Sequence, residues 1–541
     1  TNPNYPTNPT QPGSDRPVTG DNSNIGGNGS TVEINGGEFS CNGSGILYVD
    51  LHAANLNTTG FTMTVNGGQF KNANADAPVL VYDDEGNTQT SAVLLSKILK
   101  GGIYSKKPVQ ELVAFGYHIE ANTDSHTSSA YPWRVAANSA EGAEVSISKP
   151  GETTVYSTLA AFRDATNAGN TFAGYTVTLL KDIDMAGIND WKAIGDDGNE
   201  YDNLDKNFSG IFEGNGKTIS NLAISSPNYW GAALFGYVDG TVKNLTISNS
   251  SCSGIGGNAI LAVMCGGNVT IENCHLIGCS VSTSSSSGLM ISYVLSAETA
   301  VIKNCSTDAN SSITSTGGYQ IGGIIGQTTS INTLEITDCV NRASVTGIYG
   351  IGGIIGQFGN NITNATLTRC KNYGAIQLTT HTIQYAGGIA GVIPTTTSVN
   401  TNYKFVDCEN HGTVTAAPEW PTFNSCTGGM IGYAYQNEYV SLSMKGCKNT
   451  AAVGSDRSIY SGGMIGWHHY AAGTGVFQYT ECTNTGAITA TQNAQQGNHN
   501  AGRAGQLVGC SDNSHDNSTN CVLTGTASAN GVTKLSGEEV N

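Results

Sequence analysis

The amino-acid sequence predicts an all-β protein built as a parallel β-helix, a solenoid of about nine or more coils. Three observations carry this prediction. Gly accounts for 70 of the 541 residues, whereas Asp, Glu, Lys and Arg together make up only 12%. A short glycine-rich phrase recurs about every 34 residues. After it comes an alternation of apolar and polar residues, which is the pattern of a β-strand with one buried face.

The composition excludes several other classes of protein. Disordered chains combine low hydrophobicity with many charges, but 38% of these residues are hydrophobic and charges are scarce. Collagen needs Gly at every third position, and the glycine clusters do not keep that period. A net charge of −17 argues against nucleic acid and anionic membranes as partners. No apolar run approaches the ~18 residues of a membrane span, so no transmembrane segment is expected.

Residues 1–22 are rich in Pro, Asn and Thr and lack hydrophobic periodicity. This composition predicts a flexible tether that joins the folded part to an anchor on the cell surface. The alternative is a frayed terminus without a role of its own.

Residues 23–148 are expected to form a smaller N-terminal β-helical segment. An alternating strand precedes a Gly-Gly pair in STVEINGGEF at 30–39, FTMTVNGGQF at 61–70 and LSKILKGGIY at 95–104. The pairs are 31 and 34 residues apart, a spacing typical of solenoid repeats.

Residues 149–230 are expected to hold a capping helix followed by lead-in strands. Within 153–169, Val155, Leu159 and Phe162 fall at i, i+4 and i+7, and Gly169 closes the pattern. This spacing predicts a helix of about three turns. Because the open end of a β-helix exposes unpaired strand edges, we expect this helix to cap the second array of repeats.

Residues 231–541 contain the repeats of the main β-helix. Nine units carry the glycine-rich phrase, as in IGGIIGQT at 321–328 and SGGMIGWH at 461–468, with spacings of 26 to 43 residues. One coil cannot cover its own apolar face, but coils stacked about 4.8 Å apart bury a continuous column and pair their backbones. The Gly-Gly pair is expected at a corner where the chain turns tightly.

Cysteine ends the alternating strand in most of these units. Eight of the 14 cysteines fall at or near the same point of the coil: Cys274, Cys305, Cys339, Cys370, Cys408, Cys447, Cys482 and Cys521. We expect these thiols to stack inward as small apolar side chains, and no CxxC pair with zinc spacing is present. Disulfides are the alternative for the cysteines that lie off this column: Cys252, Cys265, Cys279, Cys426 and Cys510.

An asparagine follows the cysteine by two residues in five successive units: Asn341, Asn372, Asn410, Asn449 and Asn484. Asparagine tolerates left-handed backbone angles and can hydrogen-bond to its copies in neighbouring coils. The repeated asparagine therefore predicts a stacked corner of the solenoid.

The segments YTVTLLKDIDMAG at 175–187, WKAIG at 191–195 and FSGIFEGNGKTISNLAI at 208–224 resemble the lead-in of surface proteins with GLUG repeats, common in gut anaerobes. The GGIIG phrases that follow are similar to their repeats, so that the resemblance covers roughly residues 150–541. Residues 95–136 resemble a β-helical unit of similar cell-surface proteins. The resemblance implies a right-handed, pectin-lyase-like β-helix on an extracellular, adhesin-like protein, and it implies no activity. Some members are attached to zinc peptidases, but this sequence has no HExxH motif.

Aromatic residues close to the glycine-rich phrase are the first candidate site. They either precede the Gly-Gly anchor by two to four residues or follow the last glycine of the phrase, and the block WHHY adds a cluster. The candidates are Tyr319, Tyr349, Tyr385, Tyr433, Tyr460, Trp467, His468, His469 and Tyr470. Stacked columns of this kind offer flat apolar faces with polar tips that suit contact with glycan or protein. The alternative is that the rings only shield a corner.

The acidic stretch DDGNEYDNLD at 196–205 is the second candidate site. Hard carboxylates at this density can hold calcium, the one cofactor that we consider. Its carboxylates include Asp196, Asp197, Asp202 and Asp205. The spacing differs from that of an EF-hand loop, and the alternative is a solvated insertion.

These observations together predict a monomeric, extracellular adhesin or binding protein, anchored through its N-terminal tether, that recognises a glycan or a host or partner protein. The main alternative is a polysaccharide-active β-helix enzyme, a lyase or a glycoside hydrolase, and a structural stalk is the second. An enzyme needs carboxylates or a base that converge in one place. The charges just before the ladder cysteines are of mixed sign and look like a solvated face: Asp338, Arg369, Asp407 and Glu481.

Overall fold

The computed structural model of the protein divides into two compact units, residues 1–170 and 171–541, which are described separately. No helix among the described residues is long and apolar enough to cross a lipid bilayer. The described residues are 31–41, 47–50, 62–72, 80–83, 98–108, 112–114, 116–188, 191–195, 206–226, 231–379, 384–396, 399–416, 425–470, 475–491, 502–511, 516–530 and 532–535.

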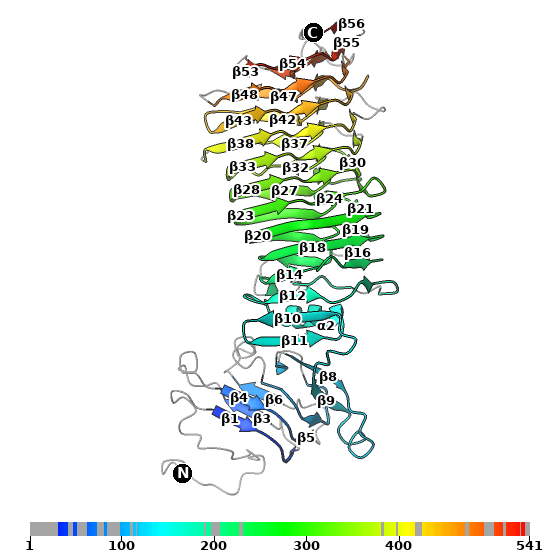
Figure 1. Ribbon diagram of the computed structural model, residues 1–541, viewed down its shortest axis with the longest axis vertical. Helices are drawn as coiled ribbons and strands as arrows, with labels where there is room; N and C mark the ends of the chain where they lie inside the picture. Colours follow the sequence, from blue (N-terminus) through cyan, green and yellow to red (C-terminus); the bar gives the residue numbers. More distant parts are fainter. Residues whose placement is uncertain are drawn as a thin grey trace. The chain divides into compact units, whose positions relative to one another are not determined.

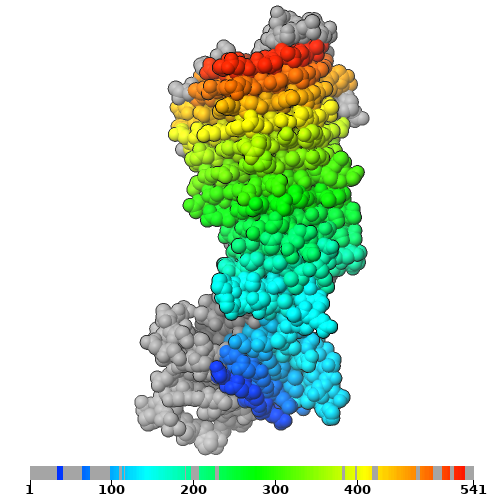
Figure 2. Space-filling model, in the orientation of Figure 1, coloured from blue at the N-terminus to red at the C-terminus, as the bar shows by residue number. Residues whose placement is uncertain are grey.

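Residues 171–541 form a parallel β-helix, which confirms the fold class predicted from the repeats (Figure 1). From residue 287 onward, each rung of the helix contributes strands to three sheets, here numbered 1 to 3, and strands of successive rungs pair in parallel. Equivalent positions of the repeat are in register, so that Ile321 pairs with Ile351 and Ile351 with Ala386. In Figure 2 these rungs follow one another as bands of colour from cyan to red.

Sheets 1 and 3 are built from the strands that begin and end each rung. The strands of sheet 1 are, in order, β22 (Ser287–Gly288), β26 (Gln320–Gly322), β31 (Gly350–Gly352), β36 (Gln384–Gly387), β41 (Ser425–Gly428), β46 (Tyr460–Gly462) and β51 (Arg503–Gly505). The strands of sheet 3 are, in order, β16 (Ala223–Ser226), β19 (Ser251–Gly254), β21 (Ser280–Thr283), β25 (Ser312–Ser315), β30 (Ser344–Gly347), β35 (Ile376–Leu378), β40 (Val414–Thr415), β45 (Val453–Gly454), β50 (Ile488–Ala490), β55 (Thr526–Ala529) and β56 (Val532–Leu535). Only the last pair of sheet 3, β55 with β56, is antiparallel among the described pairs of this unit.

Sheet 2 takes up to three strands from each rung. Its early strands are β12 (Thr176–Leu179), β13 (Ile183–Asp184), β14 (Ile211–Glu213), β15 (Thr218–Ser220), β17 (Phe235–Val238), β18 (Thr241–Ser248), β20 (Ala262–Ile277), β23 (Ile291–Lys303) and β24 (Ser306–Thr307). The first strands of the later rungs are β27 (Ile325–Thr329), β32 (Ile355–Gln357), β37 (Ala390–Ile393), β42 (Ile431–Gln436), β47 (Ile465–Tyr470) and β52 (Val508–Ser511). The second strands are β28 (Ile331–Thr337), β33 (Ile362–Thr368), β38 (Thr401–Val406), β43 (Val440–Lys445), β48 (Phe477–Thr480) and β53 (Asp516–Thr519). The third strands are β29 (Val340–Asn341), β34 (Lys371–Asn372), β39 (Glu409–Asn410), β44 (Lys448–Asn449), β49 (Thr483–Asn484) and β54 (Val522–Leu523).

The column of cysteines lies inside the solenoid, as predicted, except that its last member, Cys521, is only partly buried. Each thiol donates to a backbone carbonyl of the preceding rung, as from Cys370 Sγ to Ile336 O at 3.3 Å. All 13 cysteines whose side chains are described are free thiols. The alternative of disulfides is therefore not realised at the off-column positions Cys252, Cys265, Cys279, Cys426 and Cys510. Burial raises the pKa of the Cys279 thiol to about 11 and so keeps it protonated at neutral pH.

The five repeated asparagines form a buried ladder, which confirms the predicted hydrogen bonds between copies. Nδ2 of each member donates to Oδ1 of the next at 2.7–2.9 Å, from Asn341 through Asn484. The second amide hydrogen goes to the carbonyl two residues further along the chain. Thr307 Oγ1 donates to the first member, and the last member donates to Gln506 Oε1.

The left-handed corner lies elsewhere than predicted. The asparagines of the ladder belong to short strands and are not among the residues with positive φ. Instead, the residue just before most ladder cysteines has φ between 51° and 57°: Asn273, Asn304, Asp338, Arg369, Asp407, Glu481 and Asn520. The chain therefore turns before the cysteine, and the asparagine two residues later packs inside the turn.

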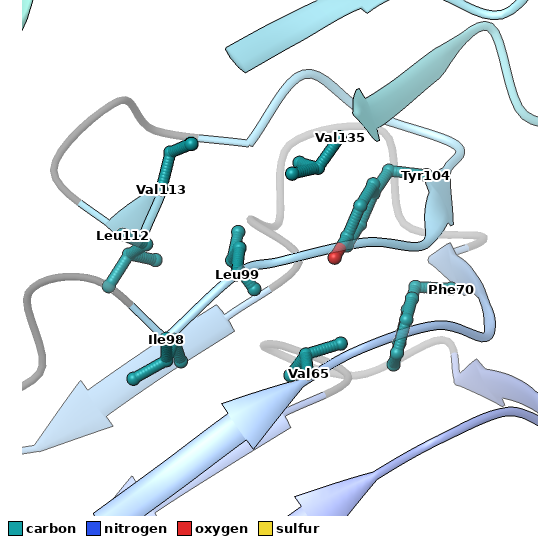
Figure 3. Close-up of a cluster of buried hydrophobic side chains, with 8 residues drawn as sticks. All are labelled: Val65, Phe70, Ile98, Leu99, Tyr104, Leu112, Val113 and Val135. Atoms are coloured by element: carbon teal, nitrogen blue, oxygen red, sulfur yellow. The ribbon is translucent and has the colours of Figure 1, made fainter. Parts of the chain in front are cut away.

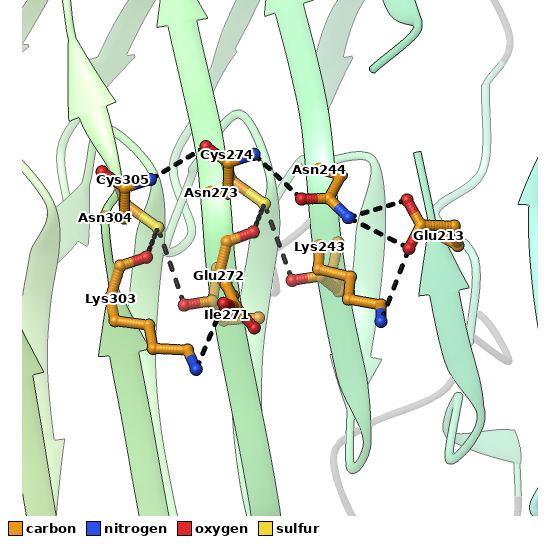
Figure 4. A network of polar contacts seen from close by, with 11 residues as sticks. Glu213, Lys243, Asn244, Ile271, Glu272, Asn273, Cys274, Lys303, Asn304 and Cys305 are labelled. Atoms are coloured by element: carbon orange, nitrogen blue, oxygen red, sulfur yellow. Dashed lines mark hydrogen bonds and ion pairs between the residues drawn. The ribbon is translucent and has the colours of Figure 1, made fainter. Parts of the chain in front are cut away.

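Side chains on this left-handed corner bind one another across rungs (Figure 4). Asn304 Nδ2 donates to Asn273 Oδ1 at 3.0 Å, and Asn273 Nδ2 donates to Asn244 Oδ1 at 2.9 Å. Asn244 Nδ2 then donates to both carboxylate oxygens of Glu213, at 2.9 and 3.0 Å. The corner is thus a second, outer ladder of polar side chains.

Close approach explains the Gly-Gly pairs of the main repeats better than a tight turn does. Neither Gly387 nor Gly388 has positive φ. A Cβ on Gly387 would lie 1.9 Å from Ala390 O, and a Cβ on Gly388 would lie 2.2 Å from Gly429 O and 2.3 Å from Asn410 Cγ. The second glycine therefore leaves the room that the asparagine ladder occupies.

The first unit contains the smaller β-helical segment that the sequence predicts. Its parallel pairs are β1 (Thr31–Ile34) with β4 (Thr62–Val65), β2 (Glu38–Cys41) with β5 (Gln69–Asn72), β5 with β7 (Ile103–Tyr104), and β3 (Leu47–Asp50) with β6 (Leu80–Asp83). The rings of Phe39, Phe70 and Tyr104 stack in a column with centroid distances of 5.1 and 5.0 Å. Figure 3 shows Phe70 and Tyr104 with the aliphatic side chains, such as Val65 and Leu99, that complete this core.

The rest of the first unit departs from the parallel pattern. Strand β9 (Trp133–Ala137) is antiparallel to β7 and to β8 (Tyr117–Ala121), and β10 (Val145–Lys149) forms a hairpin with β11 (Glu152–Tyr156). Helix α2 spans Leu159–Asn167, and Thr158 Oγ1 caps it by accepting from Ala161 N at 3.0 Å. The helix is shorter than predicted because the β-branched residues before it belong to β11. Its capping role stays a prediction.

Candidate functional site

The predicted aromatic residues meet at the corner between sheets 1 and 2 of the second unit. We call this surface the aromatic band. Its members are Tyr319, Tyr349, Tyr385, Tyr433, Tyr460, Trp467 and His469. The centroid distances between neighbouring rings are 5.9 Å for Tyr319–Tyr349, 5.3 Å for Tyr349–Tyr385, 4.4 Å for Tyr385–Tyr433, 5.2 Å for Tyr433–Trp467, 5.6 Å for Tyr460–Trp467 and 5.1 Å for Trp467–His469.

Two register columns build most of the band, one on each side of the corner. The column on sheet 1 consists of Gln320, Gly350, Tyr385, Cys426, Tyr460 and Arg503. The column on sheet 2 consists of Gln327, Gln357, Val392, Tyr433, Trp467 and Cys510. Contacts cross the corner between the columns, as from Gln320 Nε2 to Gln357 Oε1 at 3.1 Å.

The rings differ in exposure along the band. Tyr319 is 53% exposed, and Tyr349, Tyr433 and Trp467 are half-buried. Tyr385 and Tyr460 are buried beneath them, against Cys426, Ile459 and Cys510. The inner rings therefore shield the corner, while the outer rings keep a surface that a ligand can reach.

Two phenol groups of the band, those of Tyr349 and Tyr385, are held in their protonated form. Burial raises the pKa of Tyr349 above its ordinary value, and burial with nearby titratable groups raises that of Tyr385 further. The Tyr433 hydroxyl lies 3.0 Å from His469 Nδ1. The band thus combines apolar ring faces with polar hydroxyl and imidazole groups that can form hydrogen bonds.

The block WHHY is divided by the alternation of strand β47. Trp467 and His469 belong to the band, and their rings stack 5.1 Å apart. His468 is fully buried, stacks 4.1 Å from the ring of Phe477, and contacts Gln436 through Nε2. It is therefore an interior residue that no surface ligand can touch. Tyr470 is half-buried at the end of the strand.

Arg503 and the glutamine pair are residues of this site that the sequence analysis missed. Arg503 stands three residues before Gln506, as Tyr385 and Tyr460 stand three residues before Gly388 and Gly463. Alignment of the repeats at this anchor, without selecting for aromatic residues, would have found it. The same offset leads to Gln320, which is three residues before Gly323.

Four carboxylates on the outer face of the second unit form ion pairs with Lys or Arg. The ion pairs are Lys243 with Glu213 at 3.5 Å, Lys303 with Glu272 at 3.1 Å, Arg369 with Asp338 at 2.7 Å, and Lys371 with Glu409 at 3.2 Å. Each partner lies one rung from the other. Of the charges that directly precede the ladder cysteines, Asp338 and Arg369 pair with each other across rungs.

The first unit has a hollow of about 510 Å³ over its Gly-Gly corners. Its lining is Gly36, Gly37, Glu38, Gly68, Gln69, Gly102, Ile103, Arg134 and Val135. The Arg134 guanidinium is already bound to Glu120 at 2.6 Å. A second hollow of about 440 Å³ lies beside Tyr117 and Glu152. Neither hollow is lined by a buried charge that would define a ligand.

The calcium candidates Asp196, Asp197, Asp202 and Asp205 lie outside the described residues, and so does the predicted tether 1–22. Within the described part of the chain, no group of three or more His, Cys, Asp or Glu side chains is arranged to hold a metal ion.

Comparison with known proteins gives one distant structural likeness to report. No protein-family model and no curated protein sequence matches the chain. A crystal structure described as "putative immunoglobulin A1 protease from Bacteroides ovatus" is similar over 44% of this chain and 68% of its own, with 24% sequence identity and a TM-score of 0.34. This likeness assigns no family and no activity, and the β-helix rests on the strand register of the chain itself.

Proposed function

We propose that the chain is an extracellular, adhesin-like binding protein of the cell surface that recognises glycans through the aromatic band. The observation that carries the proposal is the continuous contact of rings from Tyr319 to Trp467, of which the outer ones stay open to solvent. Touching aromatic rings that are in part open to solvent are a feature of surfaces that meet a partner.

The chemistry of the band suits sugars. Apolar faces of a sugar ring can pack on Tyr and Trp, whose amphipathic side chains serve interfaces that are partly apolar and partly wet. Beside the rings, the amides of Gln320 and Gln357 can exchange hydrogen bonds with sugar hydroxyls. The GLUG-like repeats support the cell surface as the site of action, as does the resemblance to adhesin-like proteins.

A glycan array with the full chain tests this proposal. Trp467→Ala and Tyr319→Ala are expected to weaken binding of the recognised glycan about tenfold or more, which corresponds to about 1.4 kcal/mol. Tyr373→Ala is the matched control, because Tyr373 is 45% exposed but lies outside the band, where its ring stacks on His411. The control is expected to bind as the wild type does.

Two results would contradict the proposal. One is the absence of binding to every glycan of the array. The other is an equal loss of binding in the control and the band variants. A depolymerisation assay on anionic and neutral polysaccharides runs in parallel, because product release without stable binding would favour the enzyme alternative instead.

A further inference from the structure

We infer that Arg503 makes the aromatic band selective for glycans that carry a carboxylate, such as uronic or sialic acids; this inference rests on the proposed function. Arg503 is the last residue of the sheet 1 column, directly after Tyr460 in register. Its side chain is exposed. It therefore stands where a ligand lying along the band would end or pass.

The guanidinium reaches across the corner toward the sheet 2 column. Arg503 Nη1 lies 3.3 Å from the thiol of Cys510, and Cys510 pairs in register with Trp467. Neighbouring strands are about 4.8 Å apart. A carboxylate attached directly to a sugar ring that packs on the half-buried Trp467 is thus within reach of the guanidinium.

The charge of Arg503 is available to a ligand. Among the described residues, no carboxylate lies within ion-pairing distance of it, whereas Arg134, Arg163 and Arg369 each bind one. The guanidinium donates to the thiol of Cys510, which is a weak acceptor, and most of its five hydrogens stay free to donate to a ligand.

The surroundings of Arg503 select for a negative group. The two columns of the band contain no acidic residue, and Arg503 is their one permanent cation. The whole chain carries a net charge of −17, so a cationic, acid-free stripe is a local exception on an acidic protein. A planar guanidinium matches the two oxygens of a carboxylate in a bidentate pair.

The test compares pairs of glycans that share their sugar rings and differ in charge. The probes are oligogalacturonate, a hyaluronan oligosaccharide and sialyllactose, each compared with its methyl ester. Dextran sulfate is added to test whether the anionic group that Arg503 binds is a sulfate instead of a carboxylate. The wild-type chain is expected to bind the free acid of at least one pair about tenfold more tightly than its ester.

Variants of Arg503 test whether this residue causes the preference for the free acid. Arg503→Gln is expected to reduce the ratio of acid affinity to ester affinity to about one. Its affinity for the ester is expected to stay within about twofold of the wild-type value. Arg503→Lys keeps the positive charge but loses the planar guanidinium that can bind both carboxylate oxygens. Its preference for the acid is expected to lie between those of the wild type and Arg503→Gln. Arg369→Gln, which removes an exposed arginine outside the band, is the matched control and is expected to keep the preference.

Several outcomes would overturn the inference. Equal binding of acid and ester in every pair, or a preference that survives Arg503→Gln, contradicts it while glycan binding itself stands. Arg503-dependent binding of dextran sulfate without any acid-over-ester preference assigns the residue to sulfate instead. Absence of binding to every glycan of the array rejects both the proposed function and this inference.

Discussion

Asn410 uses its whole side-chain amide inside the solenoid. Nδ2 donates to Gly412 O at 3.0 Å and to Asn449 Oδ1 at 2.8 Å, and Oδ1 accepts from Asn372 Nδ2 at 2.9 Å. A buried amide is stabilising only when its partners are all present, since an unpaired polar group in the interior costs free energy. The ladder therefore depends on every member.

Replacement of Asn410 by Ala is expected to destabilise the second unit. Two amide partners and one carbonyl lose their hydrogen bonds, and each buried group left unpaired costs roughly 1–3 kcal/mol. The expected loss in the free energy of unfolding is thus roughly 3 kcal/mol or more. Urea unfolding, followed by circular dichroism, measures it.

Asn402→Ala is the control for this substitution. Asn402 is exposed and only weakly bound to Asn364, at 3.5 Å, so its removal is expected to change the free energy of unfolding by less than about 0.5 kcal/mol. Equal effects of the two substitutions would show that the ladder contributes nothing special to stability.

At the scale of the element, the left-handed corner joins rungs by charge as well as by amides. Arg369 Nε and Nη2 each donate to a carboxylate oxygen of Asp338 at 2.7 Å. Hydrogen bonds from Arg369 and the attraction of its charge hold the pKa of Asp338 below its ordinary value. A lowered pKa means that the folded state favours the ionised carboxylate.

This shift predicts a stability term that disappears in acid. The term is fully present above the unfolded pKa of about 3.9 and is lost as the pH falls through the lower folded pKa. Arg369→Gln is therefore expected to lower the urea midpoint slightly at pH 7, because exposed pairs contribute little. The difference from the wild type should vanish near pH 2. A difference that persists there would mean that Arg369 stabilises the corner by packing alone.

The features that could be predicted from the sequence are those in which the same residue type recurs in successive rungs and contacts its own copies. The cysteine column and the asparagine ladder show themselves as equal residues at equal offsets, because each copy touches the next. The left-handed corner was assigned to the wrong position, since Asn, Asp, Arg and Glu all occupy it and no single residue type marks it. Arg503 was missed for the same reason, because the column on sheet 1 changes residue type at almost every rung.

The start of helix α2 shows a different limit. Apolar spacing matched a helix from Val155 onward, but Val155 pairs with Ser146 in the β10–β11 hairpin. Strand pairing in the hairpin therefore outweighs the helical spacing of the apolar residues at the start of this segment. His468 is a similar case, because the alternation of one strand separates it from His469, while the sequence shows only two adjacent histidines.

At the scale of the whole second unit, stability is expected to vary along the stack. Each rung contacts its neighbours, so the stability of a solenoid is approximately a sum of rung and interface contributions. Strands in the middle, such as β33, have partners on both sides, whereas β53 and β54 end sheet 2. Terminal rungs should therefore open more easily than central ones.

Amide hydrogen exchange with mass spectrometry tests this gradient. Backbone amides of β28, β33 and β38 are expected to exchange at least tenfold more slowly than those of β53 and β54, a ratio that corresponds to about 1.4 kcal/mol. Uniform protection along the stack would contradict the gradient and indicate that the unit opens only as a whole.

The asparagine ladder also has a direction. Thr307 donates to Asn341, every asparagine donates to the next, and Asn484 donates to Gln506. The side-chain dipoles thus point the same way and add, as peptide dipoles do in an α-helix, although a β-sheet itself has only a small net dipole. Gln506 Nε2 ends the series as a buried donor without an acceptor among the described residues. The electrically positive end of the ladder therefore lies at Gln506, three residues along the chain from Arg503.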